Sequence, residues 1–270
     1  MRDGLKPGLI KEIDALRVSG EGNSPISEKV ITDEELTIKI DGRVAARLTY
    51  LPSEPELLGW GFLVSGGWIS SAEEVKTFRL GRNILNVELR EPKDGELASI
   101  LSSCGKEVAL RAKNQPEEKD HDGPGKIPVV PGSFLAGDVF SAMAEFQKTD
   151  VLHGETGGTH SAGIARGGVL LFNFPDVGRH NAVQKVLGRM LVDKVPASDK
   201  VLFTTGRISS EMVTACAELS IPVIVSKSAP MSSALDRARE RGVTVIGFAR
   251  GRRMTCYTFP ERLKIESLSG

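Results

Sequence analysis

Short apolar runs alternate with helix-like segments through the second half of the chain, and this rhythm limits the possible folds more than any other feature. The strand-like runs are "GVLLFNF", "DKVLFTT", "IPVIVSK" and "VTVIGFA". The first three precede "RHNAVQKVLGRMLVDK", "SSEMVTACAEL" and "MSSALDRARERG", and the fourth leads into "MTCYTF". Such alternation is typical of βαβ units with right-handed crossovers. We therefore predict an α/β protein whose second half holds a mostly parallel sheet flanked by helices.

The first half reads instead as a smaller α+β unit. "LTIKIDGRVAARLTYL" predicts a hairpin that turns at Asp41 and Gly42, and a helix is expected from Pro55 to the Gly66-Gly67 pair. A stretch rich in proline, glycine and charge then separates the halves and is the expected linker. The predicted boundaries are 1–112 for the N-terminal domain, 113–132 for the linker and 133–265 for the α/β domain.

Charge and cysteine usage exclude several classes of protein. The 270 residues include 35 basic and 35 acidic side chains, so the formal net charge is zero and no nucleic-acid partner is expected. No stretch has the length or apolarity of a membrane span or a signal peptide, so we expect no membrane partner. Three widely spaced cysteines suit a reducing compartment, and the expected location is cytoplasmic.

Polar and cationic residues gather where the predicted strands end. Ligands of parallel sheets bind beyond the carboxyl ends of the strands, so these residues are expected to share one pocket. The planar guanidinium groups of arginine and the N-termini of helices both bind phosphate oxygens, which favours a nucleotide as the ligand. The common nucleotide-binding motifs, G-x-G-x-x-G and the P-loop, are absent. The alternative to a ligand pocket is a surface row of helix-capping residues and solvated arginines. The segments are residues 173–180, 204–207, 226–230 and 250–253.

Two histidines stand out. His180 lies in "DVGRHN", where Asp176 is either a helix cap or, with its neighbours, one wall of the pocket. His160 lies in "TGGTHSAG", which reads as a glycine-rich turn or as a close approach of backbone to ligand. A zinc deaminase would need H-x-E and P-C-x-x-C, but Ala162 replaces the glutamate and C-x-x-C is absent. No metal site is therefore expected.

The three cysteines differ in their surroundings. Cys216 falls on the apolar face of a predicted helix and Cys256 lies in a predicted strand, so both are expected to be structural. Cys104 lies in "SSCGKE", where hydroxyl groups and glycine suggest an accessible thiol and Lys106 would favour its thiolate. An inert loop cysteine is the alternative reading.

Together these motifs resemble the formate dehydrogenase accessory sulfurtransferases of the FdhD/NarQ family. The segments that carry the resemblance are "DVGRHNAVQKVLG", "TGRISSEMV", "IPVIVSKSAP", "GVTVIGFARGRRMTCYT", "TGGTHSAG" and "LLGWGFLVSGGWISSAEEV". The resemblance runs from about Glu34 to Tyr257. It implies a cytidine-deaminase-like fold, without zinc, for the second domain.

The resemblance also implies a function. Such proteins take sulfur from a cysteine desulfurase as a cysteine persulfide and pass it to the molybdenum bis(molybdopterin guanine dinucleotide) cofactor of formate dehydrogenase. The implied partners are the desulfurase, formate dehydrogenase and a second copy of the chain. The persulfide position falls on Cys104, and a GDP-like nucleotide is the expected mimic of the cofactor. The expected cofactor-binding residues are Phe248, Ala249, Arg250, Gly251, Arg252 and Arg253, with Arg207, His180 and Ser228 nearby.

Two departures from the family pattern bear on this function. Glu107 stands where the family usually has the second cysteine of a C-x-x-C, and Gly66 stands where glutamate is usual. A second thiol would resolve the persulfide or pass sulfur on, so its absence predicts a relay on a single cysteine. It also keeps open an alternative, a cofactor-binding chaperone that transfers no sulfur.

Overall fold

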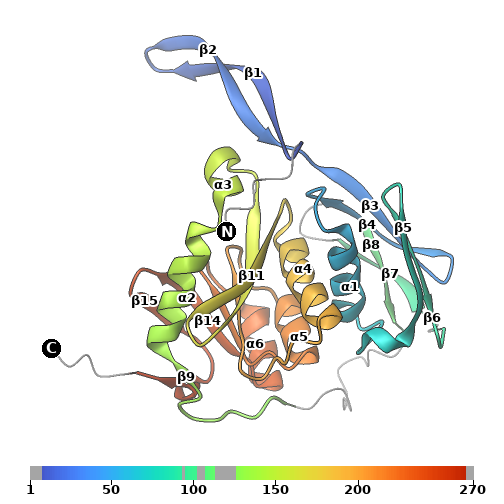
Figure 1. Ribbon diagram of the computed structural model, residues 1–270. Coiled ribbons are helices and arrows are strands. Elements are labelled where there is room, and N and C mark those ends of the chain that lie inside the picture. The colour runs from blue at the N-terminus through green and yellow to red at the C-terminus, as the bar shows by residue number, and fades with distance from the viewer. Residues whose placement is uncertain (1–7, 93–94, 102–106, 113–125, 266–270) are drawn as a thin grey trace.

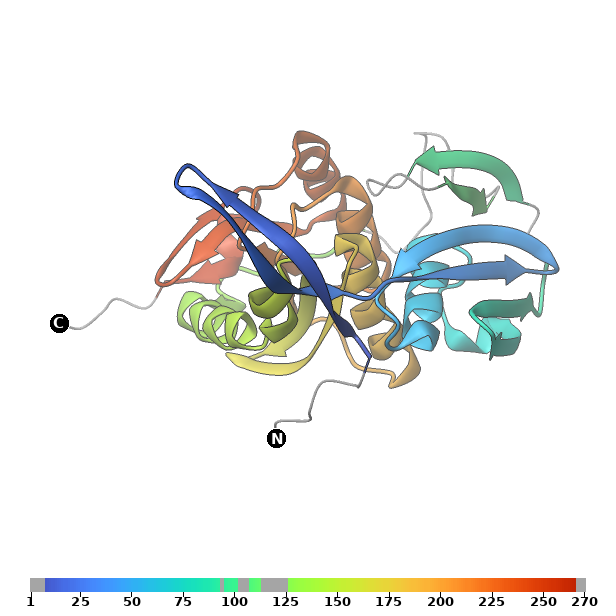
Figure 2. The same ribbon diagram turned by 90° about the horizontal axis from the view of Figure 1, so that it is seen from above.

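The protein folds into two halves that lie side by side (Figures 1 and 2). The computed structural model describes residues 8–92, 95–101, 107–112 and 126–265 of the 270-residue chain. Cys104 and Lys106 lie outside the described residues.

The N-terminal half holds a six-stranded sheet with strand order β5-β6-β3-β4-β8-β7. The expected hairpin at Asp41 and Gly42 is confirmed as β3–β4, and both turn residues have positive φ. The expected helix is confirmed as α1, which ends at Gly66. The elements are β3 (Glu34–Ile40), β4 (Arg43–Tyr50), α1 (Pro55–Ser65), η1 (Ala72–Glu74), β5 (Val75–Gly81), β6 (Ile84–Leu89), β7 (Gly95–Leu101) and β8 (Glu107–Ala112).

The C-terminal half is built on a second six-stranded sheet with strand order β11-β10-β12-β13-β14-β15. Its strands are β10 (His160–Arg166), β11 (Val169–Asp176), β12 (Val201–Thr204), β13 (Val223–Ser226), β14 (Thr244–Arg250) and β15 (Arg253–Cys256). Its helices are α2 (Ala136–Lys148), α3 (Val151–Thr156), α4 (Arg179–Val192), α5 (Ser210–Glu218) and α6 (Ser232–Arg241). Two short strands, β9 (Phe134–Leu135) and β16 (Leu263–Lys264), pair beside it, next to η2 (Pro260–Arg262).

The prediction of a mostly parallel sheet is wrong. Only the β12–β13 and β13–β14 pairs are parallel, whereas β11–β10, β10–β12 and β14–β15 are antiparallel. The cause is a tight turn at Gly167 and Gly168, which have φ of 51° and 78°. Two consecutive residues of positive φ favour a hairpin, so β10 and β11 fold back on each other. The sheet is mixed, with a parallel centre.

Alternate residues of the central strands face two different cores. Leu202 packs with Ile224 and Val245 on the side of α4 and α5, whereas Phe203 packs with Phe146 of α2 on the other side. Helices therefore cover both faces of the central strands, as the alternating sequence pattern predicts.

The two halves meet through close packing of α1 on α4. A Cβ atom on Gly61 would lie 1.8 Å from Gln184 O, and one on Gly188 would lie 2.0 Å from Leu57 O. Only glycine permits such an approach of two helix backbones. The main hydrophobic core accordingly includes residues of both halves. The domain boundaries at 112 and 133 stay a prediction.

The first two strands, β1 (Ile10–Ser19) and β2 (Gly22–Ile31), were not expected from the sequence. They form a two-stranded antiparallel hairpin that projects from the body of the molecule (Figure 1).

Candidate functional site

The four polar segments that follow strands β11, β12, β13 and β14 lie at one edge of the C-terminal sheet. Strand β11 is antiparallel to β10, and β10 is antiparallel to β12, so β11 runs in the same direction as β12, β13 and β14. All four carboxyl ends therefore fall on the same side, as predicted. We call residues 177–180, 204–209, 226–230 and 248–253 the rim.

Hydrogen bonds tie neighbouring segments of the rim together. Ser226 Oγ donates to Gly206 O at 2.6 Å, which joins the ends of β12 and β13. The backbone N–H of Phe248 donates to Ser228 O at 3.0 Å, and Arg250 Nε lies 3.4 Å from Lys227 O. The predicted residues Ser228, Phe248 and Arg250 are therefore brought together.

The predicted cluster of Asp, Arg, His and Asn divides into two pairs with different environments. Asp176 is fully buried and accepts hydrogen bonds from Leu51 N, Gly178 N and Asn181 Nδ2 at 2.9–3.2 Å. Asn181 Nδ2 also donates to Thr49 O at 2.8 Å. Asp176 and Asn181 thus fasten the N-terminal half to the C-terminal half. The expectation that the whole cluster forms a pocket wall is wrong for these two residues, since their polar atoms are used inside the protein.

Arg179 and His180 are the members of the cluster that contact the rim. The side chain of Arg179 lies against Gly206, where a Cβ atom would be 2.7 Å from Arg179 Cβ. His180 Nε2 lies 2.9 Å from Ser209 Oγ, the N-cap residue of α5. Burial, and next the charge of Arg179, lower the pKa of His180 to about 4. His180 is therefore neutral at physiological pH, and Arg179 is the cation of this part of the rim.

A second polar network flanks the rim on the side of β10. His160 is the first residue of β10 rather than part of a glycine turn, and its Nδ1 lies 3.3 Å from Thr205 Oγ1. Asp150 accepts a hydrogen bond from Ser161 Oγ at 2.7 Å, and its other oxygen lies 3.5 Å from Lys227 Nζ. The pairing of Asp150 with Lys227 could not be expected from the sequence, because only the fold brings the start of α3 next to the end of β13.

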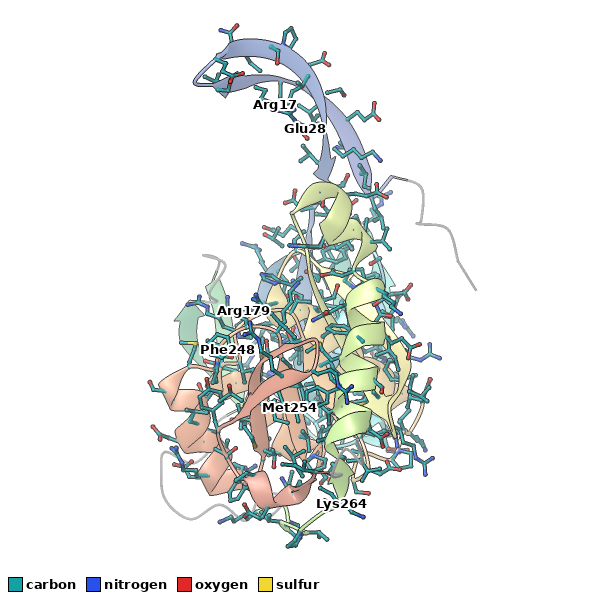
Figure 3. The ribbon with its side chains drawn as sticks, turned by 90° about the vertical axis from the view of Figure 1, so that its left-hand side faces the viewer. Arg17, Glu28, Arg179, Phe248, Met254 and Lys264 are labelled. Atoms are coloured by element: carbon teal, nitrogen blue, oxygen red, sulfur yellow. The ribbon has the colours of Figure 1, made fainter. Side chains whose placement is uncertain are left out.

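The "FARGRR" segment forms the outer part of the rim. Phe248 has φ of 52°, and its ring is 46% exposed, whereas Ala249 packs into the core behind the sheet. Arg250, Arg252 and Arg253 are exposed around the hairpin turn at Gly251. A cavity of about 420 Å³ opens beside them, and Figure 3 shows this side of the molecule. Its lining residues are Phe248, Arg250, Arg253, Met254 and Thr255. Ala249 therefore offers a ligand no side-chain contact there.

The predicted site residue Arg207 is exposed on the loop after β12. The next residue joins this loop to the loop after β13, because Ile208 N donates to Ala229 O at 3.1 Å and Ile208 O accepts from Met231 N at 2.9 Å.

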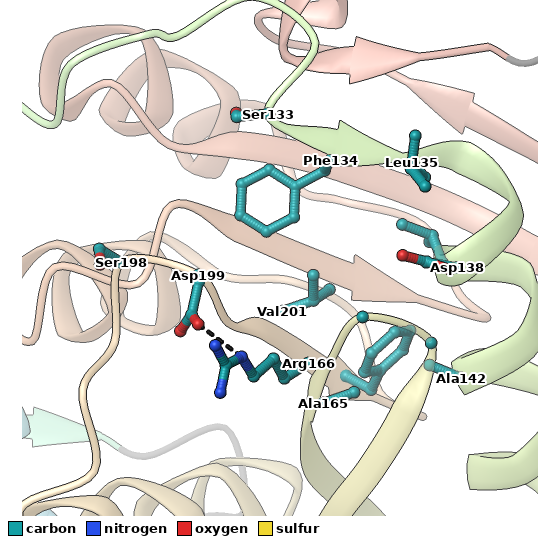
Figure 4. A pocket seen from close by; sticks show the side chains of 14 residues that line it. Ser133, Phe134, Leu135, Asp138, Ala142, Ala165, Arg166, Ser198, Asp199 and Val201 are labelled. Atoms are coloured by element: carbon teal, nitrogen blue, oxygen red, sulfur yellow. Dashed lines mark ion pairs between the residues drawn. The ribbon is translucent and has the colours of Figure 1, made fainter.

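A larger cavity, of about 480 Å³, lies at the opposite edge of the sheet (Figure 4). Phe134, Val139 and Phe203 contribute to its apolar wall, and Arg166 pairs with Asp199 at 2.7 Å beside it. None of the predicted site residues lines this cavity.

The two described cysteines are poor candidates for a reactive thiol. Cys216 is fully buried in the main core, and burial raises the pKa of its thiol. Cys256 is partly buried, its Sγ lies 3.4 Å from Thr258 O, and burial is the main cause of its raised pKa. Both thiols are therefore kept protonated at neutral pH, and the structural role predicted for them fits this environment.

Comparison with known proteins identifies the family. The model of the FdhD/NarQ family matches residues 31–264. The chain belongs to the FdhD/NarQ family. The sulfur carrier protein FdhD of Shouchella clausii is 32% identical over 90% of this chain and 92% of its own length. The sulfur carrier protein FdhD of Methanothermobacter thermautotrophicus is also 32% identical, over 94% of this chain and 99% of its own.

Structural comparison agrees with this membership of the FdhD/NarQ family. The crystal structure of a protein described as a formate dehydrogenase accessory protein, from Desulfotalea psychrophila, superposes with a TM-score of 0.76 at 26% identity. The match covers 95% of this chain and 100% of that one. The resemblance drawn from the motifs is thereby confirmed, and a sulfur carrier role linked to formate dehydrogenase follows from it.

No helix in the described part of the chain is long and apolar enough to cross a membrane. Among the same residues, no three histidine, cysteine, aspartate or glutamate side chains are grouped closely enough to hold a metal ion.

Proposed function

We propose that this protein carries sulfur as a persulfide on Cys104 and delivers it to the molybdenum bis(molybdopterin guanine dinucleotide) cofactor, its substrate, held at the rim. The observation that carries the proposal is the convergence of the arginine-bearing segments on one edge of the sheet, in a chain of the FdhD/NarQ family. A cysteine desulfurase supplies the sulfur, and formate dehydrogenase receives the completed cofactor. The relay operates in the cytoplasm, where thiols stay reduced.

The side chains of the rim are suited to bind the guanosine diphosphate part of the cofactor. Arg250, Arg252 and Arg253 offer planar guanidinium groups to phosphate oxygens. Arg207 adds charge from the loop after β12, and Arg179 adds charge from the start of α4. The exposed ring of Phe248 beside the cavity is suited to stack on a purine base. Ser228 and neutral His180 add a hydroxyl and an imidazole to the polar groups of the rim.

The sulfur step is assigned to Cys104 because Cys216 is buried, Cys256 is partly buried, and the pKa of both thiols is raised. The thiolate of Cys104 would attack the outer sulfur of the desulfurase persulfide. A new S–S bond forms on Cys104, the S–S bond of the desulfurase breaks, and the desulfurase cysteine leaves as a thiolate. Glu107 takes the place of a second thiol, so this relay uses one cysteine.

The likeness of the C-terminal half to cytidine deaminases is part of the same proposal. The mixed sheet with helices on both faces is compatible with that fold. In this proposal, the edge of the sheet at which a deaminase binds its substrate binds a nucleotide in this protein. The zinc chemistry of a deaminase is absent, because Ala162 stands where the catalytic glutamate belongs.

A cofactor-binding chaperone without sulfur transfer is the second candidate, and Glu107 is the observation that favours it. A complementation experiment in cells that lack the native protein distinguishes the sulfur carrier from the chaperone. Under the sulfur-carrier proposal, the Cys104→Ser variant fails to restore formate dehydrogenase activity although it is expressed and still binds GDP. Full restoration by Cys104→Ser would reject the carrier proposal in favour of the chaperone.

A further inference from the structure

Lys227 lies in the middle of the rim, directly after the last residue of β13. Strands β12 and β14 lie on either side of β13 and run parallel to it. The backbone of Lys227 contacts both sides, since its N–H donates to Thr204 O and its carbonyl oxygen lies 3.4 Å from Arg250 Nε. The segment after β12 carries Arg207, and β14 ends at Arg250. The lysine therefore stands between two arginine-bearing segments.

The ammonium group of Lys227 is held from one side by Asp150. The distance from Lys227 Nζ to Asp150 Oδ2 is 3.5 Å. The lysine side chain is 30% exposed, whereas the carboxylate is only 8% exposed. Asp150 Oδ1 accepts a hydrogen bond at 2.7 Å from the hydroxyl of Ser161, a fully buried residue. The carboxylate is thus fixed inside the protein, and the lysine that it holds stays partly open to solvent.

Asp150 occupies a capping position but does not cap its helix. It is the N-cap residue of α3, where an aspartate side chain normally accepts a hydrogen bond from the first turn. Here the side chain makes no such bond, and its two oxygens contact Ser161 and Lys227 instead. A carboxylate is costly to bury unless its charge is compensated. Its placement is therefore explained by Lys227 rather than by α3.

The charges in this part of the rim act on a common group, the imidazole of His160. Burial, and next the charge of Arg179, lower the pKa of His160. The charge of Lys227 also lowers this pKa, whereas the charge of Asp150 raises it. Arg179 and Lys227 therefore both lie near His160, and a single anionic ligand there would be attracted by both cations.

The ammonium group of Lys227 has capacity for a ligand. Within the described residues, the pair with Asp150 is its one polar contact, and 3.5 Å is too long for a strong hydrogen bond. An ammonium group carries three N–H donors, so a second partner can bind without displacing Asp150. A compact positive charge of this kind suits the oxygens of a phosphate group.

We propose that Lys227 binds the phosphate groups of the nucleoside diphosphate part of the cofactor, and that Asp150 is the positioning residue that holds its ammonium group in the middle of the rim. This role rests on the proposed function, since it needs a nucleotide at the rim. Asp150 itself repels phosphate, so it favours binding only through Lys227.

Calorimetric titration of the full chain with GDP tests the role of Lys227. Lys227→Met should weaken GDP binding about tenfold or more, because charge-assisted hydrogen bonds to phosphate are lost. Lys227→Arg keeps the charge and should stay within about threefold of the wild type. Lys29→Met is the matched control, because Lys29 pairs with Glu155 of the same helix, α3, at 2.9 Å but lies outside the rim. It should leave the affinity unchanged.

A double-mutant cycle tests the role of Asp150. Asp150→Asn should weaken GDP binding roughly fivefold, because Lys227 loses the group that orders its side chain. In the Lys227→Met background the same change should strengthen binding slightly, because only the repulsion between Asp150 and phosphate is then removed. Equal losses in the two backgrounds would show that the pair merely supports the fold, and would overturn the positioning role.

A second measurement separates a phosphate contact from a disturbed fold. In phosphorus NMR at saturating GDP, Lys227→Met should shift a resonance of the bound diphosphate, whereas Lys29→Met should leave both resonances unchanged. Urea denaturation checks the fold of each variant, and Lys227→Gln replaces Lys227→Met if methionine disturbs it. Unchanged GDP affinity without the lysine, or an equal loss in Lys29→Met, would overturn the proposal.

The proposed function is measured separately, by sulfur loading of Cys104 and by the GDP affinity of Arg252→Ala. If Arg252→Ala weakens GDP binding and Lys227→Met does not, the role of Lys227 is rejected and the proposed function stands. A wild type that binds no GDP would reject both.

Discussion

Lys185 Nζ and Asp176 Oδ2 lie 2.6 Å apart, and both side chains are fully buried where the two halves of the protein meet. Lys185 also donates to Leu51 O and Pro175 O, both at 3.3 Å. This ion pair therefore holds the segment after β4 against the end of β11 and the helix α4 that begins with Arg179 and His180. A buried pair of this kind costs much to break, because the remaining charge stays buried.

We expect Asp176→Asn to lower the free energy of unfolding by roughly 3–5 kcal/mol, since it leaves the Lys185 ammonium without its counter-charge. Urea denaturation measures the change. Asp193→Asn is the matched control, because the Arg189–Asp193 pair is largely exposed and should contribute under about 1 kcal/mol. Equal effects of the two substitutions would refute this role of the buried pair.

The contact between α1 and α4 predicts a strong effect of a single methyl group. Gly188→Ala should destabilise the protein by roughly 1–3 kcal/mol, because its Cβ would lie 2.0 Å from Leu57 O and the helices must separate. Gly137→Ala in α2 meets nothing within 4 Å and should be neutral or slightly stabilising in the same thermal melts. A neutral Gly188→Ala would show that the helices are not so closely packed.

The environment of His180 predicts a loss of stability in acid. Its pKa is lowered to about 4 in the folded protein, so below its ordinary value of 6.5 the unfolded chain binds a proton that the folded protein does not. Stability should therefore fall as the pH drops from about 7 towards 4, by about 2 kcal/mol at pH 5 from this residue. His180→Gln should flatten the dependence in urea titrations at pH 5 to 8. An unchanged slope would contradict the burial of a neutral imidazole.

Binding of GDP tests the rim. Arg252→Ala should weaken GDP binding about tenfold or more in calorimetry, because a charge-assisted hydrogen bond contributes about 1.5–3 kcal/mol. Arg43→Ala, an exposed arginine on β4 of the other half, should leave the affinity unchanged. Unchanged GDP affinity in Arg252→Ala would remove Arg252 from the site.

Much of the fold could be predicted from the sequence, because the central strands and their helices are contiguous and strongly patterned. The segments "DKVLFTT", "SSEMVTACAEL" and "IPVIVSK" became β12, α5 and β13. Strand β10 was missed because "TGGTHSAG" reads as a glycine-rich turn, and its antiparallel pairing with β11 depends on the Gly167-Gly168 turn rather than on apolar periodicity. The β1–β2 hairpin was missed because most of its side chains are exposed, so its apolar residues do not alternate regularly with polar ones.

The candidate site was predictable in position but not in the role of each residue. The order of strand and loop was enough to place Arg207, Ser228 and Arg250 at one edge. The same reasoning could not show that Arg179 lies at the rim whereas Asp176 is buried. Asp176 accepts a hydrogen bond from Leu51 N, which lies 125 positions earlier in the chain. Such long-range partners are set by packing of the two halves.

Intact-mass analysis after incubation with a cysteine desulfurase and cysteine tests whether Cys104 carries the sulfur. The wild type should gain about 32 Da, the mass of one sulfur atom, in a form that a reducing agent removes. Cys216→Ser and Cys256→Ser should retain this gain, because burial raises the pKa of both thiols, whereas Cys104→Ser should lose it. A gain of the same mass in Cys104→Ser, or none in the wild type, would contradict the account.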